Sequence, residues 1–196
     1  AKARALAGKT PVMPLALLEA IGSMLPKDAV VIEEVLSSAP GARMLINAED
    51  PQSFFALRGG GIGWGLPAAI GAKLALPDRP VVALIGDGSA MYTIQGLWTA
   101  AHEKLAVVFV IINNSSYRIL KQRTNAMQQF AAQTDRYVGM ELDNPRIDYV
   151  TVARGLGVEA HRARSIAEVR ELLAAALLAG GPTLIDVEMD RAFKPV

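Results

Sequence analysis

Two oxygen-bearing side chains stand where a metal ion could link this chain to a phosphate. Asp87 lies between two glycines, directly after the apolar run 80–85 and before a helical pattern. Glycines allow a sharp turn and a close approach to a ligand, and the free N–H groups at a helix start suit phosphate. A carboxylate there would repel phosphate, so Asp87 fits only with a cation between them. Asn114 follows the next apolar run and adds an amide oxygen, so the pair predicts a metal-bridged phosphate site for Mg²⁺ or Ca²⁺.

The elements that must position these two residues alternate between strands and helices. Apolar runs predict strands over 29–32, 54–57, 80–85, 105–112, 158–160 and 183–187. Helical spacing predicts helices over 14–25, 68–76, 90–103, 149–156 and 166–178. The strands are apolar throughout rather than alternating, which is typical of a mostly parallel sheet covered on both faces. We therefore expect an α/β fold with three layers, α/β/α, and a ligand at the carboxyl ends of the strands.

Three segments carry further expectations. Residues 1–11 have no packing pattern and are interpreted as the remnant of a linker, followed by one domain over 12–196. The helix 90–103 is expected to turn four residues inward, namely Ile94, Leu97, Trp98 and Ala101. Residues 115–147 are polar and irregular, and a loop of this length in a compact domain is more often functional than idle.

Composition excludes several classes of function. The chain has 196 residues, of which 52% are hydrophobic and 20% charged, and its net charge is +1, so it is typical of a globular domain. The charge balance without a basic run argues against a nucleic-acid partner. The absence of cysteine removes disulfides, thiolate metal sites and cysteine nucleophiles. Neither a membrane-spanning run nor a signal-peptide pattern is present, and we expect a cytoplasmic protein with no membrane partner.

The motif residues resemble those of a known family. The run Gly86–Ser89, followed by a helix, a strand and Asn113–Asn114, resembles the cofactor motif of thiamine-diphosphate-dependent enzymes. The glycine-rich run Arg58–Gly71 is similar to the segment that precedes this motif in 2-oxoacid decarboxylases and acetolactate synthases. Residues 97–101 and the tail from 147 to 185 most resemble benzoylformate decarboxylases. The resemblance implies the C-terminal, diphosphate-binding domain, about the last third of a family member.

This resemblance implies a role for particular residues. Asp87, the side chain of Asn114 and the main-chain oxygen of Ser116 would hold Mg²⁺, which joins the protein to the two phosphates of thiamine diphosphate. Ile62 would be the apolar wedge that bends the cofactor, and no residue of this segment would itself be catalytic. Leu120 would line the substrate pocket. The remaining residues expected at the cofactor are Ser37, Gly60, Gly61, Gly86, Gly88, Ser89 and Tyr117.

Three positions depart from the benzoylformate decarboxylases. Leu36 stands where that group has a hydroxyl residue at the diphosphate, so any contact there must come from the backbone. Arg118 replaces a glycine, and Arg123 replaces an aromatic pocket residue. An arginine near the substrate could pair with a second carboxylate or a phosphate.

The resemblance implies a lyase that decarboxylates an aromatic 2-oxoacid with thiamine diphosphate and Mg²⁺. The partners expected are the small-molecule 2-oxoacid and the pyrimidine-binding domain of another subunit in a homo-oligomer. The glutamate that activates the cofactor would lie outside this segment, so we expect no turnover from the segment alone. Three alternatives stay open: a carboligase or lyase similar to acetolactate synthase, a decarboxylase with this domain as a separate subunit, and a non-catalytic nucleotide-binding module.

Two local patterns allow competing interpretations. Residues 63–68 fit the G-x-G-x-x-A pattern of dinucleotide-binding sites, although a convincing strand before it and a ribose-binding acid after it are missing. Glu33 and Glu34 follow a predicted strand and are interpreted as a solvated pair, although the resemblance places Glu34 near the site.

Overall fold

The fold is built around one parallel sheet of six strands. We describe a computed structural model of residues 2–37, 41–46 and 49–192. The strand order is β2-β1-β3-β4-β6-β5, and every neighbouring pair is parallel. The strands are β1 (Val30–Glu34), β2 (Phe54–Ala56), β3 (Val81–Gly86), β4 (Val107–Asn113), β5 (Glu159–Ala163) and β6 (Thr183–Glu188).

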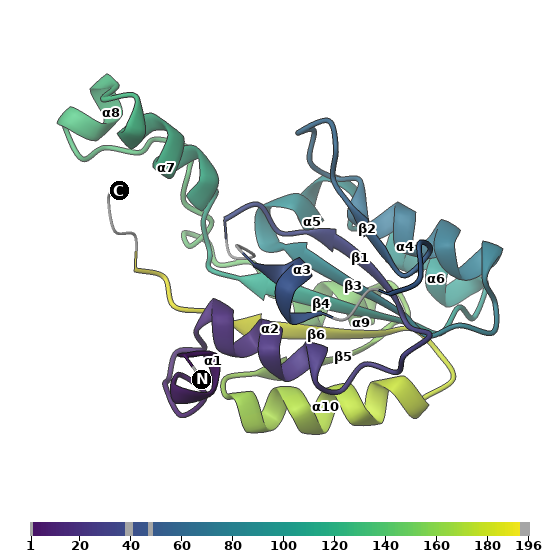
Figure 1. The fold of residues 1–196 in the computed structure, drawn as a ribbon. Coiled ribbons are helices and arrows are strands. Elements are labelled where there is room, and N and C mark those ends of the chain that lie inside the picture. Colours follow the sequence, from purple (N-terminus) through teal and green to yellow (C-terminus); the bar gives the residue numbers. More distant parts are fainter. Residues whose placement is uncertain (1, 38–40, 47–48, 193–196) are drawn as a thin grey trace.

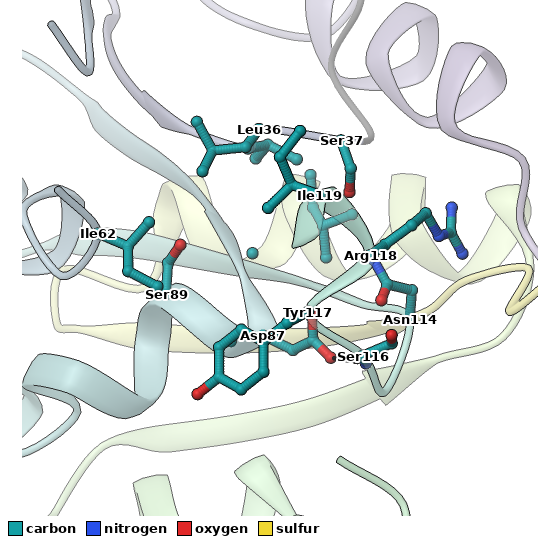
Figure 2. A pocket seen from close by; sticks show the side chains of 14 residues that line it. Leu36, Ser37, Ile62, Asp87, Ser89, Asn114, Ser116, Tyr117, Arg118 and Ile119 are labelled. Carbon is teal, nitrogen blue, oxygen red and sulfur yellow. Dashed lines mark hydrogen bonds between the residues drawn. The ribbon is translucent and has the colours of Figure 1, made fainter. Parts of the chain in front are cut away.

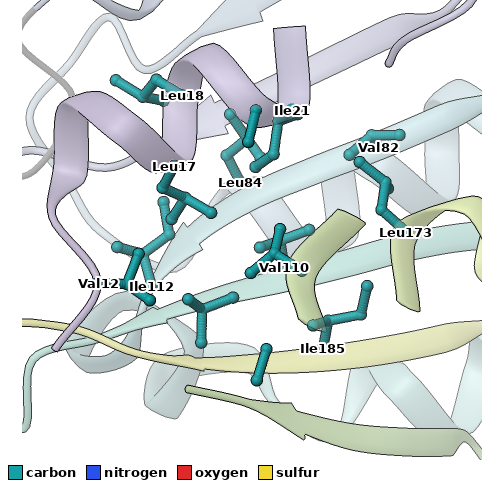
Figure 3. Close-up of a cluster of buried hydrophobic side chains, with 14 of the residues drawn as sticks. Val12, Leu17, Leu18, Ile21, Val82, Leu84, Val110, Ile112, Leu173 and Ile185 are labelled. Atoms are coloured by element: carbon teal, nitrogen blue, oxygen red, sulfur yellow. The ribbon is translucent and has the colours of Figure 1, made fainter. Parts of the chain in front are cut away.

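Helices cover both faces of this sheet, which confirms the predicted three-layer α/β/α fold (Figure 1). They are α1 (Lys2–Ala5), α2 (Pro14–Gly22), α3 (Ala42–Leu45), α4 (Gly65–Ala75), α5 (Asp87–Thr93), α6 (Gly96–His102), α7 (Arg118–Ala126), α8 (Phe130–Gln133), α9 (Tyr149–Gly155) and α10 (Ile166–Leu178). One core lies between the sheet and α2, α3 and α10, where Leu17, Ile21 and Leu173 lie over the strands (Figure 3). The second core lies on the opposite face, under α4, α5, α6 and α9.

The chain order of the strands places a switch point between β1 and β3. From β1 the chain continues to β2 on one side, whereas from β3 it continues to β4 on the other side. The helix α3 after β1 lies on one face, and α5 and α6 after β3 lie on the opposite face. Ligands of open parallel sheets bind beside such a switch point, at the carboxyl ends of the strands.

The predicted helix over 90–103 is two helices. The chain starts α5 already at Asp87, and tighter i→i+3 bonds replace the helix at Ile94 and Gln95 before α6 begins. A side chain at Gly96 would lie 2.6 Å from Leu66, so this glycine lets α6 approach α4 closely. Trp98 is 56% exposed and stacks on His102, so the expectation that it faces inward was wrong.

The polar segment 115–147 is not a plain loop, because it contains α7 and α8, which project away from the sheet (Figure 1). The buried residues of α7 are Arg118, Lys121 and Thr124, so its inward face is polar. Each of these side chains donates a hydrogen bond, to Asp190, Glu141 and Leu120 respectively. A helix of this kind has no apolar periodicity, and the prediction of an irregular segment was wrong for this reason.

The first residues pack against the domain. α1 contacts α2, Arg4 pairs with Glu19 at 3.0 Å, and Leu6 packs against the first core. The sequence pattern predicted no packing for 1–11, of which residue 1 lies outside the described residues. Among the described helices, none combines the length and the apolar character needed to cross a membrane.

Candidate functional site

The carboxyl ends of β3 and β4 lie level with each other, and this brings Asp87 and Asn114 to one edge of the sheet. Gly86 pairs with Ile112 in the register of the two strands. Asp87 follows as the first residue of α5, and Asn114 lies one residue beyond the end of β4. The Asp87 carboxylate is 2% exposed and accepts a hydrogen bond of 3.1 Å from the Ser116 amide.

The environment of Asp87 disfavours its charged form. Burial raises the pKa of Asp87 to about 6, although backbone N–H groups, those of Gly88 and Ser116 first among them, lower it in part. The Tyr149 hydroxyl donates to the backbone carbonyl of Asp87 at 2.9 Å rather than to the carboxylate. No described residue forms an ion pair with the Asp87 carboxylate, although Arg118 interacts with it through space. A metal ion in contact with this buried carboxylate would favour its charged form.

The two asparagines at the end of β4 have different surroundings. The Asn113 amide nitrogen donates to Asp186 at 2.9 Å, and its oxygen accepts from the Ser115 amide and hydroxyl. The Asn114 oxygen Oδ1 is buried without a hydrogen-bond partner in the described part of the chain. Asn113 therefore holds the loop, whereas Asn114 has an acceptor available for a ligand.

The oxygen atoms beside Asp87 fit a small hard cation. Asp87, Asn114 and Ser116 line, with other residues, a pocket whose volume is about 40 Å³, enough for an ion with a water or two. A carboxylate and an unpartnered amide oxygen are ligands that Mg²⁺ takes, with phosphate oxygens completing its shell. A buried acceptor left without a partner costs about 1–3 kcal/mol, and a bound ion would remove this cost.

A network of polar side chains holds this loop from behind. Asp186 is 1% exposed and accepts from Asn113 and, at 3.1 Å, from Arg162. Arg162 also donates to Asp148 at 2.9 Å. Ser115 adopts a positive φ of 54°, which is costly for a residue other than glycine. The hydrogen bonds that its amide and hydroxyl donate to Asn113 compensate this cost. Asp186 and Arg162 were not predicted, because single charged residues in and after a strand carry no pattern of their own.

Glu34 anchors the glycine-rich segment before α4. It is 1% exposed, and its carboxylate accepts hydrogen bonds from the amides of Gly63 and Gly65 at 2.6 Å and of Trp64 at 3.1 Å. The interpretation of Glu33 and Glu34 as a solvated pair was therefore wrong for Glu34. Because these amides already bind a carboxylate, they are not available to the phosphates of a dinucleotide, which argues against the G-x-G-x-x-A interpretation.

All residues predicted for the site line two adjoining hollows of the surface. The first contains Ser37, Ile62, Gly86, Asp87, Gly88, Ser89, Asn114, Ser116 and Tyr117. Figure 2 shows Asp87, Asn114 and Ser116 on one side of it and Leu36, Ser37 and Ile119 on the other. The second hollow contains Gly60, Gly61 and Leu120, and it shares Ile62 and Tyr117 with the first. The structure thus brings the predicted residues together, and their individual roles stay predictions.

Tyr117 and Arg118 follow the loop and complete its walls. The Tyr117 ring lies so close to Gly88 that a side chain at Gly88 would meet it at 2.5 Å. Burial raises the pKa of the Tyr117 hydroxyl. Arg118 is buried, donates to the Asp190 carbonyl and lines the first hollow, and burial lowers the pKa of its guanidinium.

Comparison with known proteins identifies the family. Residues 37–187 match the family described as thiamine pyrophosphate enzyme, C-terminal TPP binding domain. The chain belongs to this family. The resemblance noted in the motif residues is confirmed, and so is thiamine diphosphate as the cofactor that this domain binds.

Relatives of the chain include two kinds of enzyme. It is 38% identical to benzoylformate decarboxylase from Pseudomonas aeruginosa over 90% of its length. It is 34% identical to the acetolactate synthase large subunit of Parasynechococcus marenigrum over 91% of its length and 30% of that protein. The chain spans about a third of the length of these relatives, 32% of the Pseudomonas enzyme.

Solved structures agree with this assignment. A thiamine diphosphate-dependent 4-hydroxybenzoylformate decarboxylase from Rhodococcus jostii RHA1 superposes with a TM-score of 0.87 and 34% identity. The superposition covers 95% of this chain and 34% of that chain. Benzoylformate decarboxylase from Polynucleobacter necessarius superposes with a TM-score of 0.86 and 31% identity, over 97% of this chain and 35% of that one.

Proposed function

We propose that this domain binds the diphosphate and Mg²⁺ of a thiamine-diphosphate enzyme that decarboxylates an aromatic 2-oxoacid. The observation that carries the proposal is the unpartnered Asn114 oxygen beside the buried Asp87 carboxylate. The family match supports the cofactor, and the decarboxylases among the relatives support the reaction.

Different residues at the carboxyl edge of the sheet would bind the metal ion and the diphosphate of the cofactor. Asp87, the Asn114 side chain and the Ser116 main-chain oxygen hold Mg²⁺. Gly86, Gly88, Ser89 and Tyr117 would contact the diphosphate, and so would Ser37 and the backbone of Leu36 on the opposite side of the hollow. The negative charge of Asp87 is then compensated by the ion, and so the phosphates are held where the carboxylate alone would repel them.

The second hollow takes the reacting part of the substrate. When bound, thiamine diphosphate would supply a nucleophilic carbon and an electron-accepting ring for the decarboxylation of a 2-oxoacid. Ile62 supports the bent form of the cofactor, and the carbonyl of Gly60 accepts a hydrogen bond from its aminopyrimidine. Leu120 packs against the substrate and excludes water. In the overall reaction the bond between the carbonyl carbon and the carboxylate breaks, CO₂ leaves, and a proton takes its place to give an aldehyde.

The proposal includes partners that the remaining two thirds of such an enzyme would supply. The pyrimidine-binding domain of another subunit in a homo-oligomer completes the site, and this domain alone has no turnover. The domain over 12–196 and the cytoplasmic location are part of the same proposal, with residues 1–11 as a linker whose described residues pack against the domain.

A carboligase is the second candidate, favoured by the similarity to acetolactate synthase. Both reactions lose CO₂ from a 2-oxoacid, but the carboligase then joins the remaining carbon unit to a second carbonyl compound. The protein that carries this domain should be assayed with benzoylformate and with pyruvate. Benzaldehyde as the product supports the decarboxylase, and acetolactate supports the carboligase.

Substitution at the site tests whether this domain takes part in the chemistry. We expect Asp87→Ala to lower the turnover of benzoylformate at least about a hundredfold at fixed cofactor concentration, because the ion loses its carboxylate ligand. Asp78→Ala is the matched control, since Asp78 is exposed and outside the site, and it should retain wild-type turnover. Equal turnover of the wild type and Asp87→Ala would contradict the proposal.

A further inference from the structure

The second hollow has apolar walls and one charged residue. It has a volume of about 840 Å³ and is lined by Ile62, Leu120 and Tyr117 among others. Such a volume suits a small organic molecule. Arg123 is the one charged side chain among the described residues that line it. Leu120 and Arg123 lie three residues apart in α7 and therefore point from the same face of this helix.

Arg123 differs from the other cations of α7 in having no partner. Arg118 donates to the Asp190 carbonyl, and Lys121 donates to Glu141 and lies over the Tyr137 ring. In the part of the chain that the structure describes, Arg123 makes neither a hydrogen bond nor an ion pair, whereas Arg146, Arg162 and Arg164 all pair with acids. The cations on the buried face of α7, Arg118 and Lys121, thus have partners, whereas the cation on its exposed face, Arg123, lies at the hollow.

We infer that Arg123 binds a second anionic group of the substrate, at the end of the molecule away from the 2-oxoacid. This inference rests on the proposed function and specifies its substrate class. Pairing with the reacting carboxylate would be unproductive, because that group loses its charge as CO₂ leaves, and an ion pair would stabilise the substrate more than the transition state. A group that keeps its charge throughout the reaction is bound equally well at every step and determines which substrate is selected.

The walls of the hollow define the rest of the substrate. Ile62 and Leu120 suit an apolar body, aromatic or aliphatic, and Arg123 suits a carboxylate, phosphonate or sulfonate at its far end. A guanidinium donates two parallel hydrogen bonds to any of these anions, and charge-assisted hydrogen bonds are about twice as strong as neutral ones. The exposed phenol of Tyr92 lines the same hollow and offers a further donor.

Matched pairs of substrates test the inference with the full-length protein loaded with thiamine diphosphate and Mg²⁺. Benzoylformate is compared with its 3- and 4-carboxy and 3- and 4-phosphono derivatives, which differ only in the added anion. We expect kcat/KM of the wild type to be about tenfold to a hundredfold higher for at least one derivative, mostly through KM. Comparison of the carboxy with the phosphono series shows which anion the site prefers.

Variants of Arg123 separate charge recognition from a general structural effect. Arg123→Gln should lower the ratio of kcat/KM for the anionic derivative to kcat/KM for benzoylformate to about one, and Arg123→Lys should restore part of this ratio. Arg136→Gln is the matched control, because the exposed Arg136 side chain also makes neither a hydrogen bond nor an ion pair with the described residues but does not line the hollow. Direct calorimetric binding of isophthalate against benzoate gives a readout independent of turnover, and only the dianion should lose affinity in Arg123→Gln.

The possible outcomes distinguish this inference from the proposed function. If the wild type turns over benzoylformate but prefers no anionic derivative, the inference is wrong and the proposed function stands. The same holds if Arg123→Gln leaves the preference unchanged. If the wild type decarboxylates none of the compounds, both are overturned.

Discussion

Replacement of Glu34 tests how the glycine-rich segment is held in place. The side chain lies at the end of β1 and accepts three backbone hydrogen bonds, from Gly63, Trp64 and Gly65. Its charge also faces the start of α4, where a carboxylate is stabilised by the helix dipole. The segment that these bonds orient carries Gly60, Gly61 and Ile62, the residues expected at the cofactor.

The bond geometry gives the size of the effect. In Glu34→Gln a single side-chain oxygen remains, which can accept either the two bonds from Gly63 and Trp64 or the one bond from Gly65. The N–H₂ group then faces the remaining backbone amide or amides and cannot accept a hydrogen bond from them. At least one buried amide is then left unpaired, and we expect a loss of about 2–3 kcal/mol in the free energy of unfolding. Glu34→Ala orphans all three amides and should cost about 3–5 kcal/mol, a large part of the stability of a typical domain.

Urea denaturation at 25 °C measures this loss, and Glu171→Gln serves as the control. Glu171 is an exposed residue of α10, and its replacement should change the free energy of unfolding by less than about 0.5 kcal/mol. In Glu34→Gln we also expect weaker binding of thiamine diphosphate, because the backbone of Gly60 and Gly61 is no longer held in position. A change below about 0.5 kcal/mol in Glu34→Gln would refute the reasoning, since it would mean that the amides find other partners.

Three further predictions concern the carboxyl edge of the sheet. Because burial raises the pKa of Asp87 to about 6, the metal-free protein should lose about 2–3 kcal/mol in the free energy of unfolding as the pH rises from about 4 to 7. The variant Asp87→Asn should not show this loss. Identical pH profiles of the two proteins in urea denaturation would contradict the prediction. Asp186→Ala should lower the free energy of unfolding by about 3 kcal/mol and weaken Mg²⁺-dependent cofactor binding. Asp186→Asn keeps an acceptor for Asn113, so its loss of stability should be smaller. Unchanged denaturation midpoints would argue against the network. Ile62→Ala should lower kcat for benzoylformate at least about tenfold while the affinity for thiamine diphosphate stays within about threefold, and an unchanged kcat in steady-state assays would remove Ile62 from the mechanism.

The sheet and its order of elements were predictable because the strands are apolar runs between clear turn residues. The helix over 166–178 was predicted with the boundaries that the structure has, since Ser165 caps it and its apolar residues follow the helical period. The interruption at Ile94 and Gln95 was not predictable, because it depends on the close approach of Gly96 to α4. The helix α7 was missed because Arg118 and Lys121 point inward, and only their partners Asp190 and Glu141, which lie elsewhere in the chain, make that arrangement stable.

The site was predictable to the extent that its residues cluster in motifs. Asp87 and Asn114 stand at strand ends, and parallel pairing alone brings them to one edge. The supporting residues Glu34 and Asp186 were not identifiable in this way. Glu34 stands beside Glu33 at the end of a strand and Asp186 lies within a strand, and the role of each depends on the amide or side chain that the fold places opposite it.

The central claim, a cofactor held through a metal ion at Asp87 and Asn114, is tested most directly by calorimetric titration of thiamine diphosphate into the full-length protein. The titration is run with Mg²⁺ and with EDTA, for the wild type, Asp87→Ala and Asn114→Leu. We predict binding that requires Mg²⁺ in the wild type and is lost in both variants, because each removes one oxygen ligand of the ion. Equal affinity with Mg²⁺ and with EDTA, or wild-type affinity in both variants, would contradict the claim.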